Sequence, residues 1–316
     1  MVDDQLVKEA HFQLSSSSNR RFFAFRWMPG NQPVKGIVQI IPGMAEHARR
    51  YDHFARFLAS HAYGVYCCDH PGQGMTAGSP ENTGILPHHR GWQVMLENVR
   101  ALYTHIRKSQ PEMPVFVFGH SMGSVLARHF TALYPVYIQG LVLSGSFLMP
   151  GTTLSILLGL MNMKCLIEGP DKKSRWFNHL FYWNLNRHYR PRPTLFEWIS
   201  SERSEVDRYV ADPYCGFHCS NNFYRQLLRG ISATRKAERL ITYRKSLPVL
   251  VMSGQEDSVG HFGKDAVKIH KAYFDERFQH LSLKIFPGRH ELLHEKNKEA
   301  VCLYLLDWLE ESLEVK

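Results

Sequence analysis

The run Val115-Phe-Val-Phe-Gly-His-Ser-Met-Gly-Ser124 is apolar and partly β-branched at its start and ends in a Gly-x-Ser-x-Gly pattern. The apolar part predicts a buried strand, and the following Val125-Leu-Ala-Arg-His-Phe130 has the character of a helix. Ser121 would then lie on a tight strand-to-helix turn, where the small Gly119 and Gly123 allow the backbone to bend. The pentapeptide alone also fits an ordinary glycine-rich turn, but its flanks favour a nucleophilic serine at the carboxyl edge of a sheet.

Two further stretches accompany this turn: Ile40-Ile-Pro-Gly-Met-Ala-Glu-His-Ala-Arg-Arg-Tyr51 and Asp69-His-Pro-Gly-Gln-Gly74. Together the three motifs resemble the monoacylglycerol lipase and lysophospholipase branch of the α/β-hydrolases, a group that includes serine aminopeptidase-type hydrolases. The resemblance extends from about Gly36 to the C-terminus. It implies an α/β-hydrolase fold, which is a mostly parallel, doubly wound sheet with an inserted helical cap, and a Ser-His-Asp triad without cofactor or metal.

The composition is ordinary for a soluble globular protein. The chain has 316 residues, of which 44% are hydrophobic and 21% charged, so it can bury a large core. Its six cysteines have no framework spacing, and the start of the chain lacks the apolar segment of a signal peptide, so we expect buried thiols and a cytoplasmic location. The net charge of +9 is scattered, which predicts no nucleic-acid partner and leaves a solubilising surface or attraction to anionic lipid. The oligomeric state is not encoded in any recognisable pattern.

The chain alternates between predicted strands and helices except in one long segment. Antiparallel strands, the first at 11–14, are expected before residue 36, buried parallel strands at 36–41, 65–68, 115–120, 138–144 and 247–254, and a last strand at 281–286. Residues 297–313 are expected to form an amphipathic helix, with Leu303 among its inward-facing residues. From about 147 to 243 the alternation stops and leucine, methionine, aromatic and basic residues dominate. We therefore expect hydrolase core at 1–146 and 244–316, and a helical cap at 147–243.

The predicted cap contains an apolar run, Leu154 to Leu166, which is too short and too interrupted to span a bilayer. It either packs within the cap, lines a pocket for an acyl chain, or makes transient contact with a membrane surface. In the last case the protein would be peripheral to the membrane. Cys215 and Cys219, which flank Phe217-His218, suggest a metal site only weakly, because no second Cys/His pair lies nearby.

The oxyanion hole is expected from two backbone amides. In the hydrolase fold the loop after the first inner strand supplies one donor, and the residue after the nucleophile supplies the other. By motif position these are Met44 and Met122. The resembling family has His-Gly where this chain has Pro42-Gly43, so the hydrogen bonds that steady the loop must differ.

The acid and the base of the triad follow from the last two strands. Asp257, in Gly-x-x-Asp after the strand that ends at Gly254, matches the family's acid, with Glu256 and Asp265 as alternatives. His290, in Gly-x-His after the final strand, matches the base, with His294 as its competitor. The resulting chain order of serine, acid and histidine is the order of the α/β-hydrolases.

Two other acid or base candidates are set aside. Asp69 precedes the serine, which fits that chain order badly. His47 matches a family position with a structural role, as do Glu46 and Arg50.

The predicted function is hydrolysis of a lipid-like carboxylic ester, a monoacylglycerol or a lysophospholipid, through an acyl-enzyme. One alternative is a serine aminopeptidase, which would need acidic cap residues such as Glu202, Glu205 and Asp207 to hold an amino terminus. Another is a non-enzymatic, ligand-binding hydrolase relative. Epoxide hydrolases and dehalogenases carry a carboxylate where Ser121 stands, which disfavours that chemistry.

Overall fold

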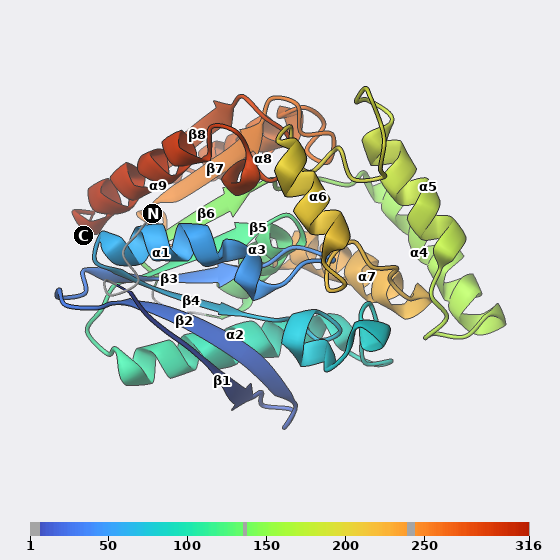
Figure 1. Cartoon of the computed structure of the whole chain (residues 1–316), viewed down its shortest axis with the longest axis horizontal. Helices are drawn as coiled ribbons and strands as arrows, with labels where there is room; N and C mark the ends of the chain where they lie inside the picture. The colour runs from blue at the N-terminus through green and yellow to red at the C-terminus, as the bar shows by residue number, and fades with distance from the viewer. Residues whose placement is uncertain (1–6, 135–137, 239–243, 316) are drawn as a thin grey trace.

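Eight strands form one sheet at the centre of the computed structural model, which describes residues 7–134, 138–238 and 244–315 (Figure 1). Their order across the sheet is β1-β2-β4-β3-β5-β6-β7-β8. The strands are β1 (Val7–Ser15), β2 (Arg21–Pro29), β3 (Gly36–Ile41), β4 (Tyr63–Cys68), β5 (Val115–His120), β6 (Gly140–Ser144), β7 (Val249–Gly254) and β8 (Leu281–Phe286).

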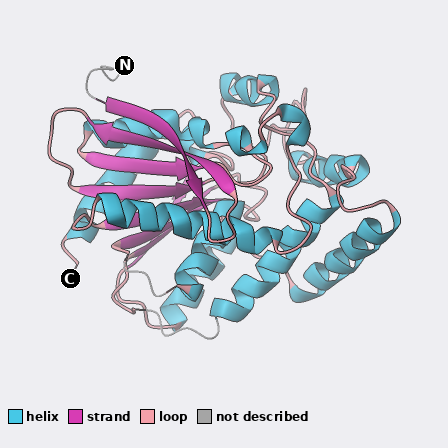
Figure 2. Ribbon diagram, turned by 90° about the horizontal axis from the view of Figure 1, so that it is seen from below, coloured by secondary structure: helices cyan, strands magenta, loops and turns pink. Residues whose placement is uncertain are grey.

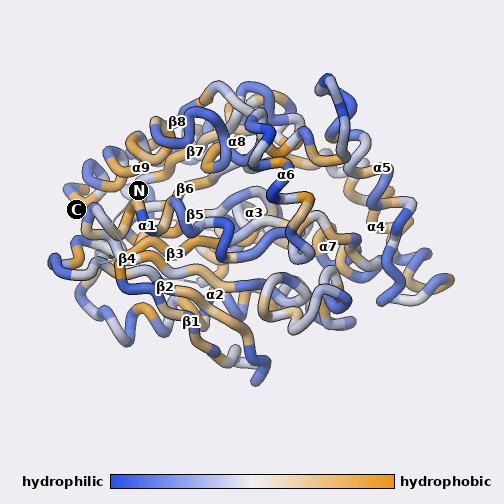
Figure 3. The backbone as a smooth tube through the Cα atoms, in the orientation of Figure 1, coloured by the Kyte–Doolittle hydropathy of each residue, from blue (hydrophilic) through white to orange (hydrophobic). Residues whose placement is uncertain are grey.

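The sheet is mostly parallel. β1 pairs with β2 and β2 with β4 in antiparallel fashion, whereas every pair from β4 to β8 across the sheet is parallel. The strands β3 to β7 are buried along their whole length and are the hydrophobic centre of the molecule in Figure 3. The predicted α/β-hydrolase fold is confirmed. Pairing with β2 extends β1 beyond the expected strand at His11–Leu14, to Val7–Ser15.

Helices cover both faces of this sheet (Figure 2). One hydrophobic cluster joins one face to α1 (Asp52–Ser60) and α9 (Lys298–Leu313). A second joins the other face to α2 (Gly91–Ser109), α3 (Met122–Leu133) and α8 (Lys264–Asp275). Leu303, which the sequence pattern placed on the inner side of the last helix, is instead 52% exposed, because the contact face of α9 is formed by its other apolar residues.

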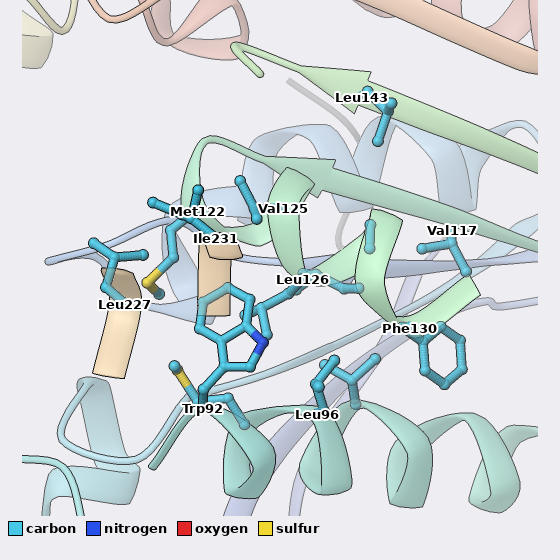
Figure 4. Close-up of a cluster of buried hydrophobic side chains, with 14 of the residues drawn as sticks. Trp92, Leu96, Val117, Met122, Val125, Leu126, Phe130, Leu143, Leu227 and Ile231 are labelled. Atoms are coloured by element: carbon cyan, nitrogen blue, oxygen red, sulfur yellow. The ribbon is translucent and has the colours of Figure 1, made fainter. Parts of the chain in front are cut away.

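The helix that follows the elbow is anchored deep in the core. Met122 and Val125 of α3 pack beside Trp92 of α2 and beside Leu227 and Ile231 of α7 (Asn221–Glu238) (Figure 4). These contacts hold the start of α3, and with it the turn at its N-terminus, in a fixed position relative to the sheet.

The described residues between β6 and β7 form four helices. They are α4 (Gly151–Ile167), α5 (Arg175–Asn186), α6 (Arg203–Ala211) and α7 (Asn221–Glu238), and they lie beyond the carboxyl ends of the central strands in Figure 1. The expected cap is helical here, although α7 also packs into the main core, and its boundaries at 147 and 243 remain a prediction. Residues 239–243, at the end of the predicted cap, lie outside the described part. Among the described residues no helix is both long and apolar enough to cross a bilayer.

Candidate active site

Ser121 occupies the sharp turn between β5 and α3. Its backbone has φ +52° and ψ −120°, a strained conformation for a residue with a side chain, and its amide donates to Ser144 O at 2.9 Å. Gly123 permits the close approach of α3 to β3, since a Cβ there would lie 2.0 Å from Ile41 O. The predicted strand-to-helix turn is therefore present, and the serine side chain is partly exposed.

Asp257 and His290 meet in a buried hydrogen bond. They follow β7 and β8, and His290 Nδ1 lies 2.9 Å from Asp257 Oδ1. The same carboxylate accepts the amides of Val259 at 2.9 Å and Gly260 at 3.2 Å. Burial disfavours both charges, but the attraction between the two groups and their hydrogen bond outweigh it. The pKa of Asp257 is therefore below its ordinary value and the pKa of His290 above its own.

The other side of the His290 ring adjoins the elbow. Its Nε2 is buried and has no hydrogen-bond partner among the described residues, and its ring lies 4.7 Å from that of His120, the residue before Ser121. A Cβ on Gly145 would come within 2.9 Å of His290 Cε1, so glycine is needed for this approach. Within the described part of the chain no hydrogen bond joins the Ser121 hydroxyl to His290. Asp257 and His290 are thus paired, and Ser121 lies beside them without a bond.

The loop after β3 adjoins the elbow from the other direction. A Cβ on Gly43 would lie 3.2 Å from Ser121 Cβ, so the backbone passes directly over the serine. Neither the Met44 amide nor the Met122 amide, the first of α3, has a hydrogen-bond acceptor within the described ranges. Two unengaged N–H groups near one hydroxyl are what an oxyanion hole requires, and the assignment of Met44 and Met122 to that role stays a prediction.

Other groups hold this loop where the resembling family has a histidine. Gln73 bridges it, because its Oε1 accepts the Ala45 amide at 2.8 Å and its Nε2 donates to Gly43 O at 3.0 Å. His70 Nε2 lies 3.2 Å from Pro42 O. The Asp69-His-Pro-Gly-Gln-Gly turn therefore supplies the support that Pro42 cannot.

The competing acids have other partners. Asp69 is buried, which raises its pKa to about 6, and its carboxylate accepts two backbone amides at 2.7 and 2.8 Å. The Glu256 side chain is exposed, and Asp265 lies 2.7 Å from His261 Nδ1. Within the described ranges none of the three forms a hydrogen bond with His290, whereas Asp257 does.

The competing histidines are also engaged elsewhere. His294 Nε2 lies 3.0 Å from Arg50 O, and burial holds the pKa of His294 well below its ordinary value. His47 Nε2 lies 2.8 Å from Asp212 Oδ2. Neither imidazole has the described ring contact with His120, at 4.7 Å, that places the His290 ring beside the elbow.

A buried charge cluster links the loop after β3 to the loop that carries His290. The Arg50 guanidinium contacts the Glu291 carboxylate, lies 3.6 Å from Glu46 Oε2, and stacks over the Tyr209 ring at 4.8 Å. Glu46 in turn accepts the Gly43 amide. Sequence reasoning assigned Glu46 and Arg50 a structural role but missed Glu291, whose position directly after His290 was the available signal.

We expect the substitution Arg50→Met to destabilise the protein strongly. It leaves the carboxylates of Glu46 and Glu291 buried without their cation, and breaking such a pair typically costs about 3–5 kcal/mol. Urea unfolding would measure the loss of unfolding free energy. Arg203→Met is the control, because Arg203 is 48% exposed and its ion pairs are solvated, so little change is expected. Equal stability of both variants would contradict the prediction.

The segment before α6 supports the histidine loop. Trp198 O accepts the His290 amide at 3.3 Å, Ile199 O accepts the Glu291 amide at 2.8 Å, and the rings of Trp198 and His290 lie 5.3 Å apart. Tyr189 reaches the acid loop, donating its hydroxyl to Glu256 O at 2.5 Å. The predicted cap therefore touches both loops that position the acid–base pair.

One further group of polar side chains lies beside the loop after β3. His47, Asp212 and Cys215 place one nitrogen, one oxygen and one sulfur atom within 4.8 Å of one another. Cys219, which the sequence pattern had coupled to Cys215, is not part of this group. All six cysteines are buried free thiols.

Comparison with known proteins places the chain among hydrolases. The family model described as "Serine aminopeptidase, S33" matches residues 32–297. The monoglyceride lipase of Mus musculus is 26% identical over 292 residues, covering 91% of this chain and 85% of the mouse protein. The monoacylglycerol lipase of Mycolicibacterium smegmatis is 34% identical over 119 residues, or 38% of this chain and 40% of the relative.

Solved structures share the fold. A thermostable carboxyl esterase from Bacillus coagulans superposes with a TM-score of 0.85 at 24% identity, covering 96% of this chain and 99% of the esterase. A soluble variant of the monoglyceride lipase from Saccharomyces cerevisiae superposes with a TM-score of 0.69 at 17% identity, covering 99% of this chain and 97% of the lipase.

Proposed function

Because the chain belongs to the hydrolase family described as serine aminopeptidase, S33, we propose that it is a serine hydrolase that cleaves carboxylic esters of a lipid-like substrate. Ser121 is the nucleophile, His290 the general base and acid, and Asp257 the carboxylate that orients the histidine. Met44 and Met122 donate their amides to the oxyanion. The observation that carries the proposal is the buried Asp257–His290 hydrogen bond, together with the His290 ring, which lies 4.7 Å from the ring of His120 directly before the strained turn of Ser121.

The reaction proceeds in two halves. His290 Nε2 takes the Ser121 proton as the hydroxyl oxygen attacks the ester carbonyl, and the negative charge that develops on the carbonyl oxygen is received by the two amides. The ester bond then breaks, and His290 gives its proton to the departing alcohol. Water attacks the acyl-serine with His290 again as base, which releases the carboxylic acid and restores the serine.

The relatives favour a monoacylglycerol as substrate. The mouse and Saccharomyces proteins are named monoglyceride lipases, and the apolar helix α4 suits the wall of an acyl pocket. A lysophospholipid has the same single acyl chain and stays within the proposal. Hydrolysis rates for monoacylglycerols, lysophospholipids and short esters across chain lengths test it. Equal rates on short and long esters would count against a lipid substrate.

An aminopeptidase activity is less well supported, despite the family description. The acidic residues that could hold an amino terminus have other roles. Glu205 is buried and pairs with Arg208 at 2.6 Å and Lys298 at 3.0 Å, Asp207 pairs with Arg203, and Glu202 caps α6. Assays of p-nitrophenyl acyl esters against aminoacyl p-nitroanilides separate the two activities. A non-enzymatic relative would hydrolyse neither.

We also propose that this cytoplasmic enzyme takes its substrate from a membrane surface. The free, buried thiols fit a reducing compartment. On α5 the exposed Trp176, Leu180 and Trp183 recur at helical spacing, and on α4 so do the exposed Ile156, Met163 and Ile167. Residues 151–193 hold seven lysines and arginines against two acidic residues. A segment that combines exposed apolar side chains with an excess of basic residues suits an anionic lipid surface.

Replacing Trp176 and Trp183 together by serine is expected to weaken membrane binding by at least about tenfold, or about 1.4 kcal/mol, because the two indoles would no longer be buried in lipid. Co-sedimentation with phosphatidylcholine vesicles containing phosphatidylglycerol measures it. The control is Leu303→Ser, which removes a similarly exposed apolar side chain on α9. Unchanged sedimentation of the double variant would exclude docking through α5.

A further inference from the structure

His47, Asp212 and Cys215 form a polar cluster outside the proposed triad. His47 Nε2 lies 2.8 Å from Asp212 Oδ2, and Cys215 Sγ lies within 4.8 Å of a ring nitrogen of His47 and of a carboxylate oxygen of Asp212. His47 and Asp212 are separated by 165 residues, so no local spacing in the sequence signals their approach. The cluster joins the loop after β3 to the connection between α6 and α7.

The three donor atoms fit a zinc-class cation. Imidazole nitrogen, carboxylate oxygen and thiolate sulfur are the usual protein ligands of Zn²⁺, and with bond lengths of about 2.0–2.3 Å they lie about 3.3–3.8 Å apart in a tetrahedral site. Reaching those separations requires a shift of about 1 Å, which flexible side chains can supply. Asp212 and His47 are 32% and 15% exposed, which leaves a route for the ion and for a water as fourth ligand.

The charge around the cluster does not oppose a cation. Burial raises the pKa of the Cys215 thiol above its ordinary value, and Arg50 offsets this only in part, so the bound cation itself must displace the thiol proton. The positive charge of Arg50 is itself balanced by Glu46 and Glu291. Asp212 adds a negative charge, and its Oδ1 accepts the Tyr214 amide at 2.8 Å, which fixes one oxygen and leaves the other for the ion.

We propose that His47, Asp212 and Cys215 bind a zinc-class divalent cation, with water in the fourth position. Binding replaces the His47–Asp212 hydrogen bond by two metal–ligand bonds and converts the Cys215 thiol to a metal-bound thiolate. One proton is released for each ion that binds. The ion is neither oxidised nor reduced.

The bound cation acts on the neighbouring loop, a consequence that rests on the proposed function. His47 is three residues after Met44, and Ala45 O already accepts the Gly216 amide at 3.0 Å and the Tyr209 hydroxyl at 2.9 Å. Drawing His47 toward Cys215 shifts the Met44 amide relative to Ser121. Because a misplacement of about 1 Å can cost on the order of 100-fold in rate, the cation is an inhibitor of hydrolysis.

Cobalt binding tests the site without any reliance on catalysis. The Ser121→Ala protein is titrated with Co²⁺, and we expect tetrahedral d–d absorption, a thiolate-to-cobalt charge-transfer band and release of one proton per ion. Cys215→Ser, His47→Asn and Asp212→Asn, each in the Ser121→Ala background, should each weaken binding by at least about 100-fold, and the first should abolish the charge-transfer band. Cys165→Ser in the same background is the control, because Cys165 and Cys215 are both 7% exposed.

The outcomes of this titration are decisive. Loss of the band in Cys215→Ser and its retention in Cys165→Ser support the site. No charge-transfer band in the parent, or the same band in Cys215→Ser, overturns it. If Cys215→Ser does not fold, the d–d absorption of His47→Asn decides whether the site exists. Loss of one of three ligands must change the tetrahedral spectrum, so an unchanged spectrum overturns the site.

Inhibition of the active enzyme is a separate test. Micromolar Zn²⁺ should lower ester hydrolysis by about tenfold or more, reversibly by a chelator, in the unaltered protein and in Cys165→Ser but not in Cys215→Ser. If the protein binds cobalt but Zn²⁺ does not inhibit hydrolysis, the metal site is supported and its proposed effect on the Met44 loop is refuted. A protein that binds cobalt but hydrolyses no ester would contradict the proposed function and leave the metal site standing.

Discussion

The substitution Ser121→Ala is expected to lower ester hydrolysis by at least about 10⁴-fold while the protein stays folded. The hydroxyl oxygen is the only atom removed, and alanine places its Cβ where serine places its own, so the turn at φ +52° keeps its geometry and its strain. Steady-state hydrolysis of a medium-chain p-nitrophenyl ester measures the loss. Thermal unfolding should give the same midpoint for the variant and the parent.

A fluorophosphonate probe gives an independent reading of the same residue. It should label the parent covalently and leave the Ser121→Ala variant unlabelled. Ser155→Ala is the matched control, because Ser155 is an exposed serine on α4 with only a local hydrogen bond, and it should keep both labelling and activity. Equal hydrolysis by Ser121→Ala and its parent would refute the serine mechanism.

The fold was predictable because its strands are short apolar runs whose ends are marked by turn-forming residues. Buried parallel strands such as Val115–His120 and Val249–Gly254 are hydrophobic along their whole length, and glycines and prolines mark their ends. The prediction failed where tertiary contact decides burial. Leu303 has the side chain and spacing of a core residue but faces solvent, since the sequence does not say which flank of α9 meets the sheet.

The candidate site was predictable only as far as it follows strand ends. Asp257 and His290 come directly after two adjacent parallel strands, whose carboxyl ends meet at one edge, so their hydrogen bond follows from the topology. The supports come from distant segments instead. Trp198 holds the His290 backbone from 92 residues away in the chain, and Asp212 meets His47 across 165 residues. Such contacts depend on how the inserted helices dock, which no local pattern encodes.

The second large effect is expected from Asp257→Asn. The asparagine fills the same space, but it has no charge and presents the wrong hydrogen-bonding group to His290 Nδ1 in one of its two orientations. Losing this carboxylate in a serine hydrolase lowers kcat by about 10⁴-fold, because the imidazole loses both its tautomer and the charge that stabilises its protonated form. Pre-steady-state acylation rates measure the loss. Glu256→Gln removes the adjacent exposed carboxylate and should leave the rate unchanged.

The pH profile separates this role from a merely structural one. His290 must be neutral to accept the serine proton, so activity rises with pH through the pKa of His290, which Asp257 holds above its ordinary value. Without the carboxylate, burial lowers the pKa of the imidazole, and only the weaker attraction of Glu291 and Glu46 opposes it, so the residual activity of Asp257→Asn should rise at lower pH than that of the parent. Suppose that Asp257→Asn lowers the hydrolysis rate but its activity rises over the same pH range as that of the parent. Asp257 would then shape the loop without affecting the pKa of His290. The base would then be governed by another group, of which the neighbouring Glu291 carboxylate is the nearest in sequence.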